Sequence, residues 1–429
     1  MEKTSGINKL YNSSIIYSFI FLFPVLQAYS IARSLGLPSL YLPIVLYLLL
    51  FLLVTINALR TFKQNKVIIR KNLLIPSFLL IYVIVIILYS YFKIREYDFL
   101  MSQYYATLQT GVVYSLLAFI IGVNMTRIIE QIYTHKKTKR LVHFSFLLLF
   151  GVLAVSVTNN FLINNQIQMT YSVDYLSISD GVAISVLVLT GLNIFKRKRY
   201  WIILMAIIIV SLTISRGGLL ALIGAYLSFY TINLKLKPSR IIGLILFIFV
   251  LIGTYVFFSF NIDLIYNIVG RNRGSEILIG LIFESGTFLQ NDPSMISRGR
   301  MLETGLMDLK EVWFLGEFMR AEINGIGYIH NWVSFWHNYG VVPFISFIAC
   351  YIVGLVKVIR EHRANSTIFS STIILLSFYT LFQIIFFRAY VYSTIWLSLG
   401  AILGYSKSLF PRNIKKDVVN SNENTSLDV

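Results

Sequence analysis

Residues 297–338 read SRGRMLETGLMDLKEVWFLGEFMRAEINGIGYIHNWVSFWHN, and they belong to a polar segment that separates two long hydrophobic regions. The whole interruption covers residues 261–336, and the chain on both sides consists of apolar runs joined by short basic connections. From Arg300 to Trp313 the apolar residues recur at helical spacing, which predicts an amphipathic helix at the membrane interface. A helix that only caps the bundle fits this pattern equally well. The segment is therefore where a substantial structure can form outside a bilayer.

The composition indicates an integral membrane protein. Hydrophobic residues make up 57% of the 429 residues and charged residues only 13%, whereas soluble domains carry about 25% charged residues. The net charge of +18 comes from short clusters between apolar runs, which is typical of topology signals. We therefore expect no nucleic-acid partner. The single cysteine, Cys350, excludes an internal disulfide and a cysteine metal site.

Apolar runs of about 20 residues predict membrane-spanning helices, because in lipid a segment must satisfy its own backbone hydrogen bonds. Twelve runs qualify, near residues 15–32, 39–59, 73–92, 106–126, 141–159, 178–195, 199–215, 217–234, 241–260, 338–356, 367–387 and 389–406. The sequence thus predicts an all-α polytopic membrane protein with one large, partly helical outer loop. Helices 1–9 would occupy residues 1–260, the loop 261–336 and helices 10–12 residues 337–406, followed by a disordered tail over 407–429.

The basic residues assign the two sides of the membrane. Alternate connections hold 26 Lys and Arg residues in one set and 11 in the other. The richer set is cytoplasmic by the positive-inside rule, which places both termini in the cytoplasm and the 261–336 loop outside.

Arginines on the outer side are candidate anion-binding residues. Arg216 ends the seventh predicted span and is followed by two glycines, which allow close approach of a ligand. A guanidinium binds phosphate oxygens in a bidentate manner, although an arginine at a helix end can also simply snorkel to the interface. Arg298 and Arg300 would stand beside helix-terminal amides if the loop helix opens at residues 297–300. A solvated turn is the alternative there. Arg320 and Arg388 are further outer-side candidates.

Two histidines of the outer loop are candidate bases. His330 and His337 lie seven residues apart, and each is followed by an asparagine, Asn331 in the first case. A histidine can act as a general base near neutral pH, but a hydrogen-bonded structural histidine is the ordinary alternative for either one. The spacing is not that of metal ligands and no carboxylate is adjacent, so we expect neither a metal nor a cofactor.

Several short motifs resemble those of the O-antigen ligase and polymerase superfamily. Arg216-x-x-x-Leu220 resembles its Arg-x3-Leu motif, and residues 300–316 resemble its arginine-led periplasmic helix that ends in a Gly turn. Gly325-x-Gly327-x-x-His330-Asn331, followed by Gly340-x-x-Pro343, resembles its Gly-x-Gly and His-Asn…Gly-x-x-Gly signature. The likeness spans residues 190–360. Looser motifs fit a polymerase better than a ligase, and the last one ends in Pro343 instead of glycine.

This resemblance implies a glycosyltransferase of GT-C-like fold in the bacterial inner membrane. Donor and acceptor would both be glycans linked to undecaprenyl diphosphate, and the product would be a long-chain O-antigen or capsule. A chain-length regulator and a flippase would be further partners. His330 would be the catalytic base, with His337 in reserve, and Arg216, Arg298, Arg300, Arg320, Arg388 and Asn331 would bind substrate.

Two other functions remain open on the sequence alone. An O-antigen ligase would transfer the finished glycan to lipid A-core. A flippase for lipid-linked oligosaccharides would need polar residues along a pathway through the membrane. Gln27, Asn57, Asn124 and Asp180 could provide that pathway, although hydrogen bonding between helices is the usual role of such residues.

Overall fold

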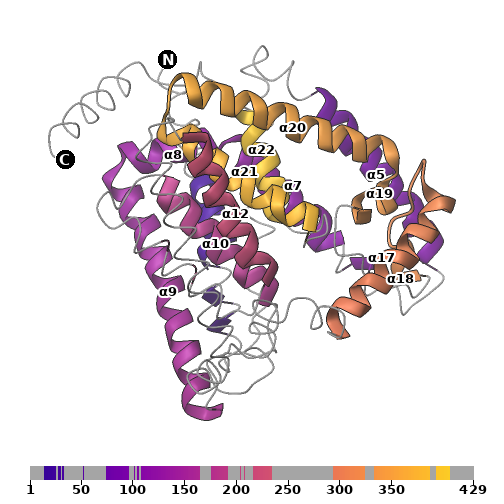
Figure 1. The fold of residues 1–429 in the computed structure, drawn as a ribbon, viewed down its shortest axis with the longest axis horizontal. Helices are drawn as coiled ribbons and strands as arrows, with labels where there is room; N and C mark the ends of the chain where they lie inside the picture. Colours follow the sequence, from indigo (N-terminus) through magenta and orange to yellow (C-terminus); the bar gives the residue numbers. More distant parts are fainter. Residues whose placement is uncertain are drawn as a thin grey trace, which may run out of the picture.

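The protein is described by a computed structural model. It covers residues 14–25, 28–29, 31–32, 52, 74–95, 101, 104–105, 108–164, 175–191, 203, 207, 216–233, 293–323, 333–386 and 393–405. Every regular element in these ranges is a helix. In chain order they are η1 (Phe21–Val25), α5 (Leu74–Ile94), η2 (Gln109–Tyr114), α7 (Ser115–Val123), α8 (Met125–Thr134), α9 (Lys136–Asn164), α10 (Tyr175–Gly191), α12 (Arg216–Asn233), α17 (Pro293–Val312), α18 (Arg320–Ile323), α19 (Val333–Tyr339), α20 (Val341–Ala364), α21 (Ile368–Phe386) and α22 (Ser393–Gly404) (Figure 1).

The helical, membrane-type character predicted from the sequence is confirmed for this part of the chain. Helix α20 and residues 368–385 of α21 are long and apolar enough to cross a membrane. Residues 112–123 and 125–134 together form a third candidate, which is bent by 59°. The number of twelve spans stays a prediction, because the runs near 39–59, 199–215 and 241–260 fall almost entirely outside the described residues.

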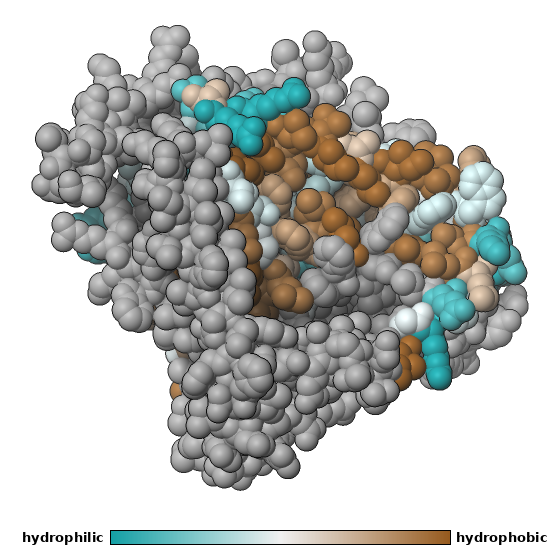
Figure 2. All heavy atoms as spheres, viewed as in Figure 1, coloured by the Kyte–Doolittle hydropathy of each residue, from teal (hydrophilic) through white to brown (hydrophobic). Residues whose placement is uncertain are grey.

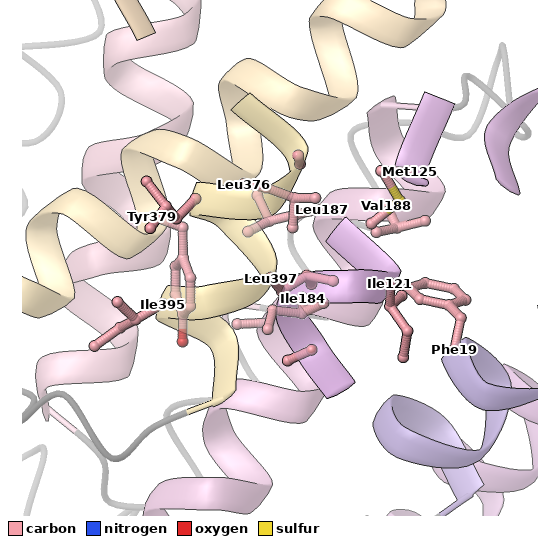
Figure 3. Packing of buried hydrophobic residues seen from close by; sticks show 14 of the residues in the cluster. Phe19, Ile121, Met125, Ile184, Leu187, Val188, Leu376, Tyr379, Ile395 and Leu397 are labelled. Carbon is pink, nitrogen blue, oxygen red and sulfur yellow. The ribbon is translucent and has the colours of Figure 1, made fainter. Parts of the chain in front are cut away.

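Helix α21 lies at the centre of the described bundle. It packs against α10, α12, α20 and α22, and α22 in turn packs against α7. Figure 3 shows Leu376 and Tyr379 of α21 beside Ile184 and Leu187 of α10, all of them buried. These helices are apolar on most sides, as expected for helices inside a membrane bundle.

Helices α7 and α22 approach each other through glycines. A Cβ atom on Gly122 would lie 2.1 Å from the carbonyl oxygen of Leu397, and one on Gly400 would lie 2.3 Å from that of Phe119. Gly404, four residues after Gly400, meets the carbonyl of Val123 in the same way, at 2.2 Å. Small residues at this spacing let two membrane helices pack backbone against backbone.

The predicted span 106–126 is not one straight helix. It begins as the π-helix η2, continues as α7 and breaks at Asn124, beyond which the amphipathic helix α8 turns away. The side-chain amide of Asn124 donates a hydrogen bond to the carbonyl of Ile120, 2.9 Å away. A side chain that bonds the backbone of its own helix competes with the regular ladder, which is consistent with a bend at this residue.

Asp180 makes hydrogen bonds between helices. Its carboxylate, 2% exposed, accepts bonds from the hydroxyl of Tyr379 at 3.0 Å and from the amide of Gln383 at 2.5 Å, both on α21. Asp180 thus forms the hydrogen bonds between helices that are usual for polar residues in membrane helices, whereas the bond of Asn124 to Ile120 lies within one helix. Gln27 and Asn57 lie outside the described residues.

The helices of the polar loop, α17, α18 and α19, lie together beside α5 and the end of α20 that follows α19 (Figure 1). Hydrophobic residues cover the visible face along α20, and hydrophilic groups gather near its two ends (Figure 2). The loop helices therefore lie near one end of this apolar face, and their position outside the membrane stays a prediction.

Candidate functional site

The loop is folded back on itself by a close contact between two glycines. Gly316 and Gly340 have φ angles of +72° and +82°. A Cβ on Gly316 would lie 2.2 Å from the amide nitrogen of Gly340, so only glycine fits there. The amide of Glu317 donates to the carbonyl of His337 at 3.0 Å, and the amide of Val341 donates to that of Trp313 at 3.0 Å. These bonds hold the end of α17 against α19 and the start of α20.

Met319 has an unusual backbone conformation at the centre of this fold. Its φ of +64° is rare for a residue other than glycine, and its side chain is buried. The amide of Met319 donates to the side-chain oxygen of Asn338 at 2.8 Å, while the amide group of Asn338 donates to the carbonyl of Ser334 at 2.8 Å. Such strain persists only where the surroundings enforce it, and it is concentrated at functional sites.

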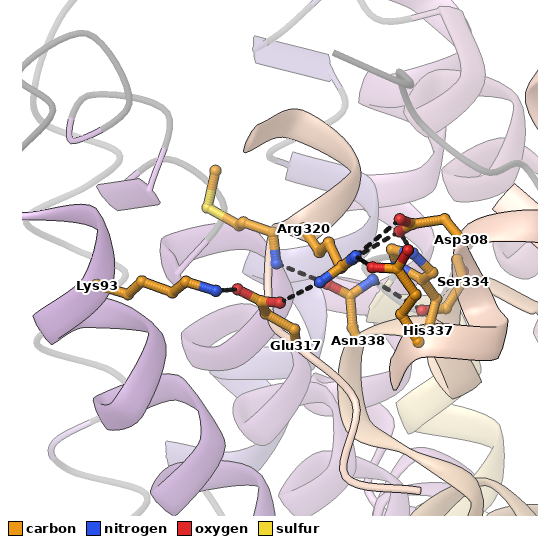
Figure 4. A network of polar contacts seen from close by, with 9 residues as sticks. Lys93, Asp308, Glu317, Arg320, Ser334, His337 and Asn338 are labelled. Atoms are coloured by element: carbon orange, nitrogen blue, oxygen red, sulfur yellow. Dashed lines mark hydrogen bonds and ion pairs between the residues drawn. The ribbon is translucent and has the colours of Figure 1, made fainter. Parts of the chain in front are cut away.

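Arg320, the next residue, is surrounded by three carboxylates (Figure 4). Its Nε and Nη2 atoms donate to the two oxygens of Asp308 at 2.8 and 3.0 Å, and Nη1 donates to Glu317 at 2.9 Å. Glu311 accepts a further bond from Nη2. The hydrogen bonds that Arg320 donates to Asp308 are the main reason that the pKa of Arg320 is raised above its ordinary value, so the guanidinium stays charged.

Asp308 also binds His337. The Nε2 atom of His337 lies 2.7 Å from Oδ2 of Asp308, and the histidine is 0% exposed. Burial lowers the pKa of His337, and this effect outweighs the opposing effect of Asp308. We therefore assign the neutral imidazole, with the proton on Nε2 facing the carboxylate. Burial alone would raise the pKa of Asp308, but hydrogen bonds from Arg320 and His337 lower it below the ordinary value.

The second ring nitrogen of His337, Nδ1, is the candidate proton acceptor of this cluster. Nδ1 is buried and makes no hydrogen bond within the described structure. With the proton on Nε2, Nδ1 carries a lone pair and can accept a proton. A carboxylate that fixes the tautomer of a histidine whose other nitrogen is bare is the arrangement used for a general base.

Glu317 connects this cluster to the membrane helices. Lys93, near the end of α5, forms an ion pair with the buried carboxylate of Glu317 (Figure 4). The hydrogen bonds from Lys93 and Arg320 outweigh the effect of burial and lower the pKa of Glu317. The contact places the end of α5 on the same side as the loop, as the alternation of basic connections requires.

Among the residues predicted from the sequence, the structure brings Arg320 and His337 together through Asp308. Arg300 is exposed on α17 and Arg216 is the first residue of α12. The side chains of Arg216 and Arg298 are not described, and His330, Asn331 and Arg388 lie outside the described ranges altogether. Their roles stay predictions, as does phosphate binding by Arg320.

One local prediction is wrong. The loop helix does not open at residues 297–300, because α17 begins at Pro293. Proline is favoured in the first turn of a helix, where its missing N–H costs nothing. Arg298 and Arg300 therefore lie within the helix, and an anion site formed by its terminal amides does not apply to them.

Sequence reasoning missed Asp308, Glu317 and Lys93. Asp308 stood out only as one of several acids of the loop, and it precedes His337 by 29 residues. Asn338 carried a weak signal, since it follows His337 in a second His-Asn pair. No group of three or more His, Cys, Asp or Glu residues with metal-binding geometry is present in the part of the chain described.

Comparison with models of protein families and with curated protein sequences finds no match to this chain. The likeness to the O-antigen ligase and polymerase superfamily thus rests on its short motifs, their order and their predicted side of the membrane.

The buried histidine predicts acid sensitivity of the loop. An unfolded histidine has a pKa of about 6.5, and a lower folded value means that the unfolded chain binds the proton more tightly. Stability should therefore be constant above about pH 6.5 and fall as the pH drops toward the folded pKa. A second loss should follow below about pH 4, as Asp308 and Glu317 become protonated. Thermal unfolding of the purified protein between pH 8 and pH 5 measures the first loss.

The matched variant for this measurement is His337→Gln, which keeps a polar side chain but cannot be protonated. The difference in unfolding midpoint between the wild type and this variant isolates the contribution of His337. A wild-type midpoint that rises on acidification relative to the variant contradicts the assignment of a neutral imidazole.

Proposed function

We propose that this protein is a lipid-diphosphate-dependent glycosyltransferase that joins lipid-linked oligosaccharide repeat units into a long-chain surface polysaccharide. The substrate class comes from the motifs, and the composition and the apolar helices support a site at a membrane surface. Undecaprenyl-diphosphate-linked glycans would serve as donor and acceptor at the outer face of the inner membrane.

The observation that carries the proposal is the Asp308–His337 pair with its bare Nδ1 atom, next to a permanently charged arginine. Nδ1 would take the proton of the acceptor hydroxyl as its oxygen attacks the anomeric carbon of the donor. The bond from that carbon to the diphosphate oxygen breaks, and the diphosphate leaves with the electron pair. Guanidinium groups can stabilise this leaving group without a metal, which is the role proposed for Arg216, Arg298, Arg300, Arg320 and Arg388.

Arg320 has a second role in this scheme. Its contacts with Asp308, Glu311 and Glu317 fix the carboxylate that orients His337. Because His337 is fully enclosed in this structure, the acceptor can reach Nδ1 only after the covering side chains move. Catalytic contacts that form only in the substrate complex are common in enzymes.

The function is tested with a deletion strain and with purified protein. Loss of a polymerase leaves one repeat unit on the lipopolysaccharide, whereas loss of a ligase leaves the core without any glycan. The purified protein, given lipid-linked repeat units alone, should produce a ladder of longer lipid-linked glycans. If no ladder forms with any lipid-linked oligosaccharide accumulated by the deletion strain, the polymerase function is contradicted.

The motifs predict that Arg216→Ala abolishes long-chain glycan at near-normal protein levels, and that His330→Ala does the same if His330, the other candidate base, takes the proton in place of His337. Removing one group that stabilises developing charge typically costs about 10²–10³-fold in rate. Gel analysis of the glycan chain-length distribution measures the effect. Arg140→Ala and His135→Ala are matched controls, since both residues are exposed and on the predicted cytoplasmic side. A wild-type distribution from either test variant removes that residue from the proposed site.

A further inference from the structure

We propose that the turn Trp313–Leu315, between α17 and the polar cluster, is inserted among the acyl chains of the outer leaflet. The outer loop would then be anchored in the bilayer instead of standing clear of it. This inference requires that α5 and α20 cross the membrane, but it does not depend on the catalytic proposal.

The exposure of the turn is unusual. The side chains of Trp313, Phe314 and Leu315 are 54%, 52% and 60% exposed, although all three are large and apolar. Residues 317–319, which follow after Gly316, are all buried. A contiguous exposed apolar segment beside a well-packed one indicates contact with another apolar phase.

Two contacts with α5 show where the turn lies along that helix. The carbonyl of Leu315 accepts a hydrogen bond from the hydroxyl of Tyr82 at 3.5 Å, while Glu317 is paired with Lys93. Tyr82 precedes Lys93 by eleven residues, a distance of about 16 Å along the helix axis. Lys93 lies at the end of α5, so the chain from Glu317 back to Leu315 runs along α5 from that end toward its preceding turns.

The contact with α20 places the turn independently, at the start of that helix. The carbonyl of Trp313 accepts bonds from the amide of Val341, the first residue of that spanning helix, and from the indole of Trp336 at 2.7 Å. The ring of Trp336 stacks on Phe344, with 5.3 Å between ring centroids. The turn is thus level with the first turn of a helix that crosses the membrane.

The surroundings favour lipid as the occupant. The two helices that the turn contacts carry exposed apolar residues, Ile81, Val85 and Leu88 on α5 and Val342 and Ile345 on α20. These are side chains that would meet lipid if α5 and α20 span a bilayer, and the exposed apolar side chains of the turn would meet the same phase. The last charged residues before the turn, Lys310 and Glu311, lie in the final helical turn of α17. The change from charged to apolar surface occurs within one helical turn, as at a membrane interface.

Spin labels on single cysteines test this placement. Cys350 is the chain's only cysteine, so Cys350→Ala provides the background for Phe314→Cys and Leu315→Cys. Labelled protein is reconstituted in phosphatidylcholine vesicles, and collisional relaxation is measured with oxygen, which partitions into lipid, and with a water-soluble nickel chelate. Glu303→Cys, exposed on α17, is the control for water, and Ile352→Cys, exposed midway along α20, is the control for lipid.

The proposal predicts that labels at positions 314 and 315 respond like the label at 352, with high oxygen and low nickel accessibility. All four labelled positions are exposed, so the labels should leave the fold intact. Nickel accessibility equal to that at position 303 would place the turn in water. Low accessibility to both reagents would mean that protein, such as a second copy of the chain, covers the turn. Either result overturns the proposal.

Discussion

Replacing His337 with alanine is expected to slow chain extension by about 10²–10⁴-fold, the usual effect of removing a general base. The variant loses the bare Nδ1 atom, while Arg320 keeps its contacts with Asp308, Glu311 and Glu317. The rate is measured on purified protein with lipid-linked repeat units. His135→Ala, on an exposed histidine at the end of α8, is the control. A rate near that of the wild type would leave His337 with a structural role and move the base to His330.

Asp308→Asn separates catalysis from structure in the same assay. Asp308 raises the pKa of His337 through its hydrogen bond and its charge, against the larger effect of burial. Removing the charge should lower that pKa further, so the acidic limb of the pH–rate profile should shift to lower pH. The maximal rate should also fall, because an amide can donate to Nε2 and so favour the wrong tautomer. An unshifted acidic limb would show that His337 does not titrate in the reaction.

Replacing Gly122 with valine is expected to disrupt the bundle. The first carbon of the new side chain would lie 2.1 Å from the carbonyl oxygen of Leu397 and 2.9 Å from the amide nitrogen of Ala401. Both are backbone atoms, so no rotamer change relieves the clash and α7 must separate from α22. Overpacking a core usually costs about 1–3 kcal/mol, and a clash between backbones belongs at the upper end of that range or beyond.

The matched control for this prediction is Gly151→Val on α9. A Cβ at Gly151 meets no atom within 4 Å, so the same substitution should be tolerated. The measurement is the thermal midpoint of each purified variant in detergent, together with the monodisperse fraction. If the Gly122 and Gly151 variants unfold at the same temperature, the close approach of α7 and α22 is wrong.

Hydropathy predicted the positions of most described helices well. The runs predicted at 73–92, 217–234 and 367–387 correspond to α5, α12 and α21 with shifts of one or two residues at each end. Hydropathy failed where a polar residue, or a glycine with a positive φ angle, interrupts an apolar run. Asn124 bends the fourth run, and Gly340 separates α19 from α20 with a backbone conformation that continues neither helix. A sum of transfer free energies over a window does not register a single residue of that kind.

For the candidate site, too, part could be predicted from the sequence and part could not. The sequence alone determined a helical, apolar chain with a polar loop, and it singled out Arg320 and His337 as chemically capable residues. Lys93 lies in one of the connections with few basic residues, as the 261–336 loop does, and its ion pair with Glu317 agrees with a common side for the two.

Only the tertiary structure paired Asp308 with His337. The two residues lie on α17 and α19, and the backbone at Gly316, Met319 and Gly340 turns one helix back onto the other. Hydropathy and residue type depend on neighbours along the chain and can be read from the sequence. The direction of a turn depends on φ angles that the packed surroundings impose, so the sequence left the partner of His337 undetermined.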